Sequence, residues 1–189
     1  MGLLGWILLA VVVIAILLTI GIYNRLVRLR ALVKEGFSGI TVQLRRRADL
    51  IPNLVSTVEG YASHEREVLT QVTAHRGDAT GARGVAETAQ ADAAFSGMLG
   101  RLMAVAEAYP DLKADDNFRQ LQDELSEIED QLQGARRYYN ATVRDLNTRV
   151  QSFPDVLLAR PLGFGEAEFY EDGDASIQTA PKVTFAAKA

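Results

Sequence analysis

The longest uninterrupted run of apolar residues lies near the amino end of the chain. Residues 3–22 (LLGWILLAVVVIAILLTIGI) number twenty and include no charged side chain. A helix of that length spans about 30 Å, which is the thickness of the hydrocarbon core of a bilayer. Trp6 and Tyr23 lie near the two ends of the run, where aromatic rings favour the membrane interface. The pattern therefore predicts a transmembrane anchor over residues 1–22.

Two other structures produce a similar run, namely a buried core helix and a cleaved signal peptide. A soluble helix rarely needs an apolar surface on every side over about five turns. A signal peptide carries a cationic segment before a shorter apolar run, whereas no Lys or Arg precedes residue 3 here. We therefore favour a helix that stays in the membrane.

Basic residues follow the apolar run. Arg25, Arg28, Arg30 and Lys34 come directly after it, against the single acidic residue Glu35. The cytoplasmic flanks of membrane helices carry an excess of Lys and Arg. The charge pattern therefore predicts a single-pass protein of the cell membrane, with its N-terminus outside and the rest of the chain in the cytoplasm.

From Tyr23 to about residue 151, apolar residues recur every three or four positions, as they do in amphipathic helices that pack together. The clearest stripe lies on the last and longest helix, which we expect over residues 116–151. Its apolar residues are Phe118, Leu121, Leu125, Ile128, Leu132, Ala135, Tyr139, Val143, Leu146 and Val150. Short connections make neighbouring helices antiparallel. The sequence therefore predicts an all-α fold, in which an antiparallel up-and-down four-helix bundle over residues 23–153 follows the transmembrane helix.

The boundary between the first two bundle helices allows two interpretations. The residues concerned are Arg45, Arg46, Arg47, Asp49, Pro52 and Asn53. Cations suit the C-terminal end of a helix, Asp suits an N-cap, and Pro suits the first turn that follows. We therefore expect a tight turn near residues 48–50. The alternative is one long helix that is kinked near Pro52.

Glycine and proline mark the other boundaries. The glycine-rich segment 76–84 (RGDATGARG) predicts a loop. The segment YPDLKADDNF predicts a connection in which Asp115 or Asp116 caps the next helix. We expect residues 154–171 to dock on the bundle in an extended form, and residues 172–189 to form a flexible polar tail.

Charge is distributed unevenly along the last helix. Residues 115–130 carry seven acidic side chains against one Arg, a net charge of −6, whereas residues 131–150 carry four Arg against one Asp, a net charge of +3. An up-and-down topology brings the acidic part to the same end of the bundle as Arg45, Arg46 and Arg47. We expect Arg136 and Arg137, in the basic part, to meet acids of a neighbouring helix or anionic lipid. The alternative for both parts is an ordinary solvated helix face.

Four asparagines stand out within or beside the predicted helices. They are Asn24, Asn53, Asn140 and Asn147. We expect structural hydrogen bonds from these side chains, and the alternative is a role in recognising a partner.

The sequence contains no recognisable catalytic, cofactor or metal site. It has no cysteine, which excludes disulfides and thiolate metal ligands. His64 and Glu65 begin like the zinc motif HExxH, but Val68 stands where the second His is required. A net charge of −4 argues against nonspecific nucleic-acid binding. We therefore expect a protein that is not an enzyme, binds no cofactor or metal and has no nucleic-acid partner.

Several segments together resemble the LemA family of bacterial membrane proteins. They are YNRLVRLR, QLRRRADLIPNLVSTVEGYASHE, YPDLKADDNFRQLQDELSEIEDQL, ARRYYNATVRDLNTRVQSFPD and LGFGEAEFYE, which cover residues 23–171 with gaps. The resemblance implies a four-helix bundle behind an N-terminal membrane helix, with no established catalytic activity. More distantly, the chain is similar to the magnetosome protein MamQ, a related branch tied to the shaping of intracellular membranes.

These features together predict a non-enzymatic scaffold or membrane-organising protein. Its expected partners are the lipid bilayer and further copies of the same chain, because anchoring every copy in one plane raises the effective concentration. The alternative is a membrane-tethered adaptor that recruits an unknown cytosolic protein through its acidic and basic helix faces.

Overall fold

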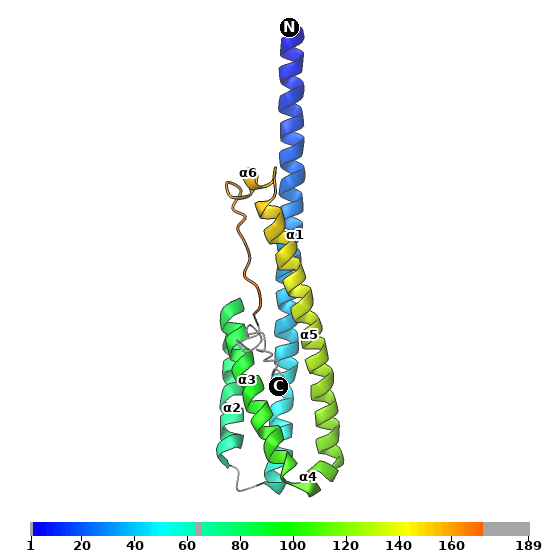
Figure 1. The fold of residues 1–189 in the computed structure, drawn as a ribbon, viewed down its shortest axis with the longest axis vertical. Coiled ribbons are helices and arrows are strands. Elements are labelled where there is room, and N and C mark those ends of the chain that lie inside the picture. The colour runs from blue at the N-terminus through cyan, green and yellow to red at the C-terminus, as the bar shows by residue number, and fades with distance from the viewer. Residues whose placement is uncertain (1, 63–65, 172–189) are drawn as a thin grey trace, which may run out of the picture. The chain divides into compact units, whose positions relative to one another are not determined.

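The computed structural model describes residues 2–62 and 66–171, and this part of the chain is helical with no strand. Its elements are α1 (Leu3–Tyr61), α2 (Arg66–Gly81), α3 (Val85–Glu107), α4 (Pro110–Ala114), α5 (Asp116–Gln151) and α6 (Val156–Ala159) (Figure 1). The all-α fold with a long apolar N-terminal helix is therefore confirmed. The four helices predicted for the bundle correspond to α1 beyond the apolar run, α2, α3 and α5. The predicted polar tail over residues 172–189 lies outside the described residues.

The turn expected near residues 48–50 is wrong. Helix α1 continues through this region to Tyr61, with Pro52 inside it. A proline in a helix interior costs about 3 kcal/mol. The cost is offset by burial, because Ala48, Ile51 and Leu54 are at most 1% exposed and continue one apolar stripe across the proline. Each large apolar side chain contributes about 1.5–3 kcal/mol on burial, so the stripe outweighs the local signals that favour a turn.

The breaks between helices lie elsewhere. The helical backbone of α1 ends at Tyr61, and α2 extends to Gly81, so only the last three residues of the predicted loop 76–84 are non-helical. Gly84 has a φ of 86°, a conformation that L side chains rarely adopt. The break that the glycines predict is therefore present, but it is shorter and lies further along the chain.

The chain divides into two compact units. Among the described residues, the first comprises residues 2–50 and 120–170, and the second comprises residues 51–62, 66–119 and 171. Helices α1 and α5 therefore each contribute to both units.

In the first unit, α1 and α5 form an antiparallel pair. A Cβ atom on Gly36 would lie 3.1 Å from the Cα of Tyr139, and one on Gly39 would lie 4.0 Å from the Cβ of Ala135. The residue numbers run in opposite directions along the two helices, which establishes the antiparallel arrangement. Gly36 permits the closest approach because it has no side chain to separate the two backbones.

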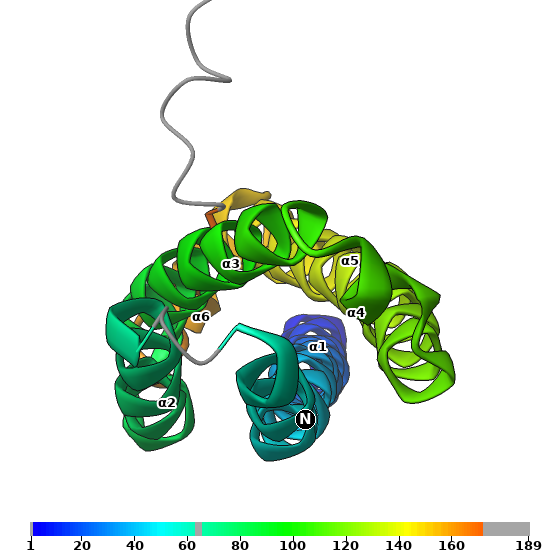
Figure 2. The same ribbon diagram turned by 90° about the horizontal axis from the view of Figure 1, so that it is seen from below.

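In the second unit, α2 and α3 are joined by three residues and lie side by side as an antiparallel pair (Figure 2). Phe95, Leu102 and Leu112 are almost completely buried here. Asp115 follows α4 and caps α5, since its Oδ1 accepts a hydrogen bond of 2.9 Å from the amide of Phe118. Asp115 is thus the one of the two predicted capping residues that makes this contact.

Candidate functional site

The apolar N-terminal part of α1 packs against nothing in the described structure. Every side chain from Leu3 to Leu18 is exposed. Within residues 2–62 and 66–171, α1 is the one helix that is long and apolar enough to cross a membrane. An apolar surface that is exposed on all sides of a helix is unfavourable in water and favourable in lipid.

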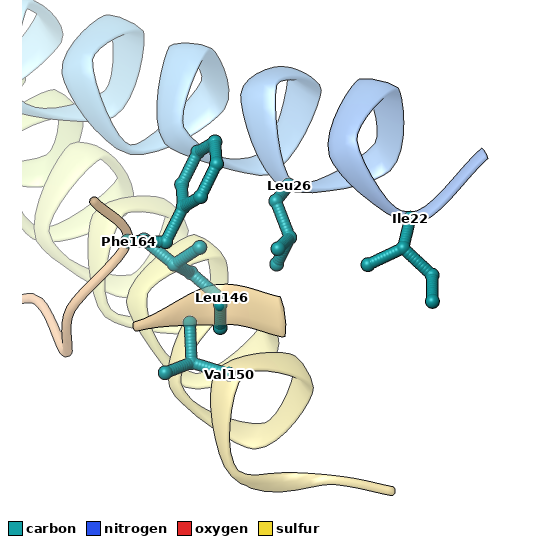
Figure 3. Close-up of a cluster of buried hydrophobic side chains, with 6 residues drawn as sticks. Ile22, Leu26, Leu146, Val150 and Phe164 are labelled. Carbon is teal, nitrogen blue, oxygen red and sulfur yellow. The ribbon is translucent and has the colours of Figure 1, made fainter. Parts of the chain in front are cut away.

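Packing begins where this apolar run ends. Ile22 and Leu26 of α1 are buried in a cluster (Figure 3). The other buried members are Leu146 and Val150 of α5, Ala159 of α6, and Phe164. The C-terminal end of α5 and the short helix α6 therefore lie beside α1 at the level where the exposed apolar run stops.

The basic residues that flank the run point outward. Arg25, Arg28, Arg30 and Lys34 are all exposed. The guanidinium of Arg30 also lies over the ring of Phe164, 4.6 Å from its centroid. Such cation–π contacts contribute about 0.5–1 kcal/mol at exposed sites. Arg30 therefore holds the C-terminal segment in addition to supplying charge beside the apolar run.

The connection after α5 forms a corner, which we define as residues 152–163. The buried carboxylate of Asp155 forms an ion pair with Arg149 of α5. The corner ends in a Schellman turn, because the amide of Phe164 donates to the carbonyl of Ala159 (2.9 Å) and the amide of Gly163 to that of Arg160 (3.0 Å). Gly163 occupies the position of this turn that requires a positive φ, here 76°. The turn directs Phe164 into the buried cluster.

Beyond the corner, residues 164–170 form an extended strap. Phe164 and Tyr170 are buried and Ala167 is half-buried, while the residues between them are exposed. An inward side chain at every third position has the spacing of a polyproline II segment. The strap therefore presents one side to the helix pair along its whole length.

Two asparagines of α5 bind the backbone of the strap. Asn147 accepts from the amide of Ala167 (2.7 Å) and donates to its carbonyl (2.8 Å). Asn140 makes the same pair of bonds with Tyr170, both at 2.9 Å. Seven helical residues advance about 10.5 Å, and three residues of polyproline II advance about 9.3 Å, so the two spacings match. Each carboxamide thus satisfies both polar groups of one strap residue. The hydrogen-bonding role expected for Asn140 and Asn147 is present, and sequence reasoning missed only that the strap is their partner.

Two further side chains of α5 contact the strap. The hydroxyl of Tyr139 donates to the carbonyl of Glu168 (2.7 Å), and burial, together with the nearby charge of Glu168, raises the pKa of this phenol. Arg136 is buried, with its guanidinium 5.5 Å from the ring centroid of Tyr170. Arg137, its neighbour in sequence, is exposed.

The arginine triplet divides among three environments. Arg47 is 2% exposed, and its Nη1 lies 2.9 Å from Oε2 of Glu129 in the acidic part of α5. Arg46 donates from Nη1 to Oε1 of Gln131 at 2.9 Å, and Arg45 is exposed. The buried Arg47 therefore joins α1 to α5.

Asp49, Pro52 and Asn53 do not form a turn, because all three lie within α1 with exposed side chains. The carbonyl of Asn53 accepts hydrogen bonds from the hydroxyls of Ser56 (2.9 Å) and Thr57 (2.8 Å). Asp49, Pro52 and Asn53 are therefore part of the continuous helix α1 and not of a turn between two helices.

The described residues contain no group of three or more His, Asp or Glu side chains that could hold a metal ion. An open groove of about 560 Å³ in the second unit is lined by Val55, Glu59, Leu69, Thr70, Thr73 and Ala74. Glu59 is the one ionisable side chain among the described residues that line it. His64 and Glu65, which begin like a zinc motif, lie outside the described residues.

The profile of the LemA family matches residues 36–185, which is most of the chain. The chain belongs to the LemA family. A LemA protein of Metamycoplasma hominis is 27% identical to it over 156 residues, which cover 77% of this chain and 71% of the relative. The family match confirms the resemblance that the sequence motifs indicate.

Proteins named for the magnetosome are also similar to this LemA-family chain. Magnetosome protein MamQ 2 of Paramagnetospirillum magneticum is 29% identical over 189 residues, and the match covers 83% of this chain and 68% of the relative. Magnetosome protein MamQ of Magnetospirillum gryphiswaldense is 25% identical over 186 residues, with the same coverage. These relatives and the apolar helix fit a membrane-associated helical protein.

Sequence reasoning did not find the role of Asp155. Asp155 is buried because the corner folds back against α5, and the local sequence pattern does not predict this fold. The seven-residue spacing of Asn140 and Asn147 on one helix face was a usable signal, because two such carboxamides two turns apart suit an extended backbone.

Proposed function

We propose that this protein is a non-enzymatic, membrane-anchored scaffold that organises the bilayer by associating with further copies of itself. The observation that carries the proposal is the abrupt change along α1 at Ile22. Before this residue the helix is apolar and exposed on every side, and from it onward the same helix packs against α5. Because α1 is one continuous helix through that boundary, the orientation of the anchor fixes the orientation of the α1–α5 helix pair.

The same proposal includes the orientation of the chain in the cell membrane. Arg25, Arg28, Arg30 and Lys34 are exposed within about three turns of the end of the apolar run. Each contributes about 1 kcal/mol near an anionic leaflet. The positive-inside rule then puts the N-terminus outside and the helical units in the cytoplasm. Reporter fusions at Ala189 test this: cytoplasmic activity is expected, and activity only on the outer side contradicts it.

Self-association is supported by exposed apolar side chains on the helix pair. Val42 of α1 is 52% exposed and Tyr138 of α5 is 46% exposed, although large apolar side chains are usually covered. Anchoring in one plane also favours contact between copies. The likeness to relatives named as magnetosome proteins adds the hypothesis that such assemblies organise a membrane.

Crosslinking in native membranes tests self-association. Because the chain has no cysteine, a single Val42→Cys variant reports contacts of this face without side reactions. We expect a disulfide-linked dimer at endogenous protein levels and none for Asp49→Cys, which is also on α1 and exposed. A protein that remains monomeric with every amine-reactive and thiol-reactive crosslinker contradicts the scaffold.

A membrane-tethered adaptor is the second candidate. Asp123, Glu127 and Asp130 are exposed on α5 at a spacing of four and three residues, so they share one helix face. Such an acidic face suits a basic partner protein. Reversing these three charges to Lys separates the two candidates: an adaptor loses a co-purified cytosolic protein, whereas the scaffold retains its oligomers.

A further inference from the structure

The exposed large apolar side chains outside the membrane anchor are concentrated in the corner that follows α5, residues 152–163. Four of them lie within ten residues: Phe153 (79% exposed), Val156 (37%), Leu157 (63%) and Leu162 (37%). Phe153 and Leu157 are the two most exposed large apolar side chains among the described residues beyond Ile20. A concentrated apolar surface of this kind marks an interaction site.

The corner lies at the depth where the anchor ends. Ala159 of α6 belongs to the same buried cluster as Ile22 and Leu26 of α1, and Leu158 packs against that cluster. Ile22 is the last residue of the apolar run, and Leu26 lies only about 6 Å further along the helix. The headgroup layer of a bilayer is about 5–7 Å thick on each side. The corner is therefore level with the headgroup layer when residues 3–22 cross the membrane.

The corner is held in this exposed conformation. The Asp155–Arg149 ion pair fixes its start on α5, and the turn at Gly163 fixes its end by placing Phe164 in the cluster. Leu158 and Ala159 of α6 face the cluster, so Val156 and Leu157 on the same short helix face away from it. The outward apolar side chains cannot turn inward without disrupting these contacts.

We infer that the α5–α6 corner is a second membrane contact, in which Phe153, Val156, Leu157 and Leu162 insert into the headgroup layer beside the anchor. Arg160 is exposed next to Leu157 and Leu162, and aromatic and aliphatic side chains with nearby Arg are the composition of interfacial membrane segments. Continuity with the anchor favours lipid over a second copy of the chain, because the corner reaches the bilayer without any assembly. The second contact stops the helix pair from swinging about a single anchor.

This inference rests on the proposed insertion of residues 3–22, so its test reports both insertions separately. Single-cysteine variants of the full chain are labelled with an environment-sensitive fluorophore and reconstituted in vesicles of phosphatidylcholine and phosphatidylglycerol. Phe153→Cys and Leu157→Cys probe the corner, and Ile14→Cys probes the anchor. Val42→Cys is the matched control, since it is an exposed apolar residue of α1 about 30 Å beyond Ile22. All four native side chains are more than half exposed on the protein surface, so replacing and labelling them removes little internal packing.

Quenching by nitroxide lipids distinguishes the outcomes. We expect shallow nitroxides to quench the two corner labels at least threefold more than the Val42 label, and deep nitroxides to quench the Ile14 label. If the Ile14 label is quenched but the corner labels are quenched no more than the Val42 label, the second membrane contact is overturned and the insertion of the anchor is not. No quenching at Ile14 overturns both. The Leu157→Cys variant is also labelled with pyrene. Excimer fluorescence from this label, together with no quenching of the corner labels by nitroxide lipids, assigns the corner to a contact with a second copy and also overturns the inference.

Discussion

Asn147 of α5 and Ala167 of the strap are joined by two hydrogen bonds, one of 2.7 Å from the Ala167 amide to Oδ1 and one of 2.8 Å from Nδ2 to the Ala167 carbonyl. A side chain here takes the place of a neighbouring β-strand, because it offers one donor and one acceptor to a single residue. Asn140 repeats the arrangement at Tyr170, so the strap is held at two points along α5.

Replacing Asn147 with Ala should release the middle of the strap. The net contribution of two hydrogen bonds to stability is roughly 1–3 kcal/mol, and in the variant the backbone amide and carbonyl of Ala167 lose these partners. We expect faster cleavage by a Glu-specific protease at Glu166 and Glu168, measured on the purified full chain in detergent. Asn53→Ala is the control, since it changes the same residue type at an exposed position of α1. Equal cleavage rates in the two variants would show that the strap is held by other contacts.

Removing the carboxylate of Glu129 should destabilise the helix pair more than removing both charges. Arg47 stays buried in Glu129→Gln and loses its charged contact with Glu129, and weakening the pairing of a buried charge is costly. We expect a loss of about 1–3 kcal/mol, below the 3–5 kcal/mol of fully buried pairs because Glu129 is 44% exposed. Chemical denaturation in detergent provides the measurement. The double variant Arg47→Met with Glu129→Gln should recover part of the loss, and a strictly additive double variant would contradict the coupling.

Replacing Pro52 with Ala should stabilise the protein. The helix regains a backbone donor and loses a steric clash, which is worth up to about 3 kcal/mol in a helix interior. A rise in the thermal midpoint is the expected readout. Ser38→Ala, at an exposed position of the same helix, should raise the midpoint by far less. If Pro52→Ala lowers the midpoint, then the chain turns at this proline in solution.

The cap of α5 should weaken in acid. The hydrogen bond from the Phe118 amide holds the pKa of Asp115 below its ordinary value, and the Tyr61 hydroxyl adds to this effect. The folded state therefore favours the ionised form. Its stabilising effect is present above the ordinary pKa of an aspartate, about 3.9, and is lost as the pH falls through the lowered folded value.

Hydrogen exchange at the Phe118 amide measures this loss. We expect exchange to accelerate, relative to the intrinsic rate, as the pH drops below about 4. Asn caps a helix nearly as well as Asp but does not titrate in this range. Asp115→Asn should therefore remove the acid dependence while keeping protection at neutral pH. The same acid dependence in both proteins would assign it to another group.

The sequence by itself determined the features that arise from composition and period. Residues 3–22 predict the exposed apolar part of α1 because twenty uncharged residues leave no polar face. The three-to-four spacing predicts α5 over residues 116–151, with the bounds that the structure has. The sequence predicts a cap at Asp115 or Asp116, because N-cap chemistry acts within three residues, and the structure has it at Asp115. Each of these signals is local, so it survives in any tertiary arrangement.

Only the tertiary structure decided between signals of similar strength. The turn chemistry around Asp49 and Pro52 is worth a few kcal/mol, and the burial of Ile51, Leu54 and Val58 is worth more. The partners of Asn147 and Asn140 lie 20 and 30 residues away, on a backbone that reverses direction after α6, and the partner of Arg149 is Asp155, beyond the end of α5. The exposed corner arises in the same way, because residues 153–162 carry an ordinary apolar pattern and only the packing of Ala159 against α1 turns the remaining side chains outward. Burial is a property of the assembled helices, and local sequence does not encode which face will be covered.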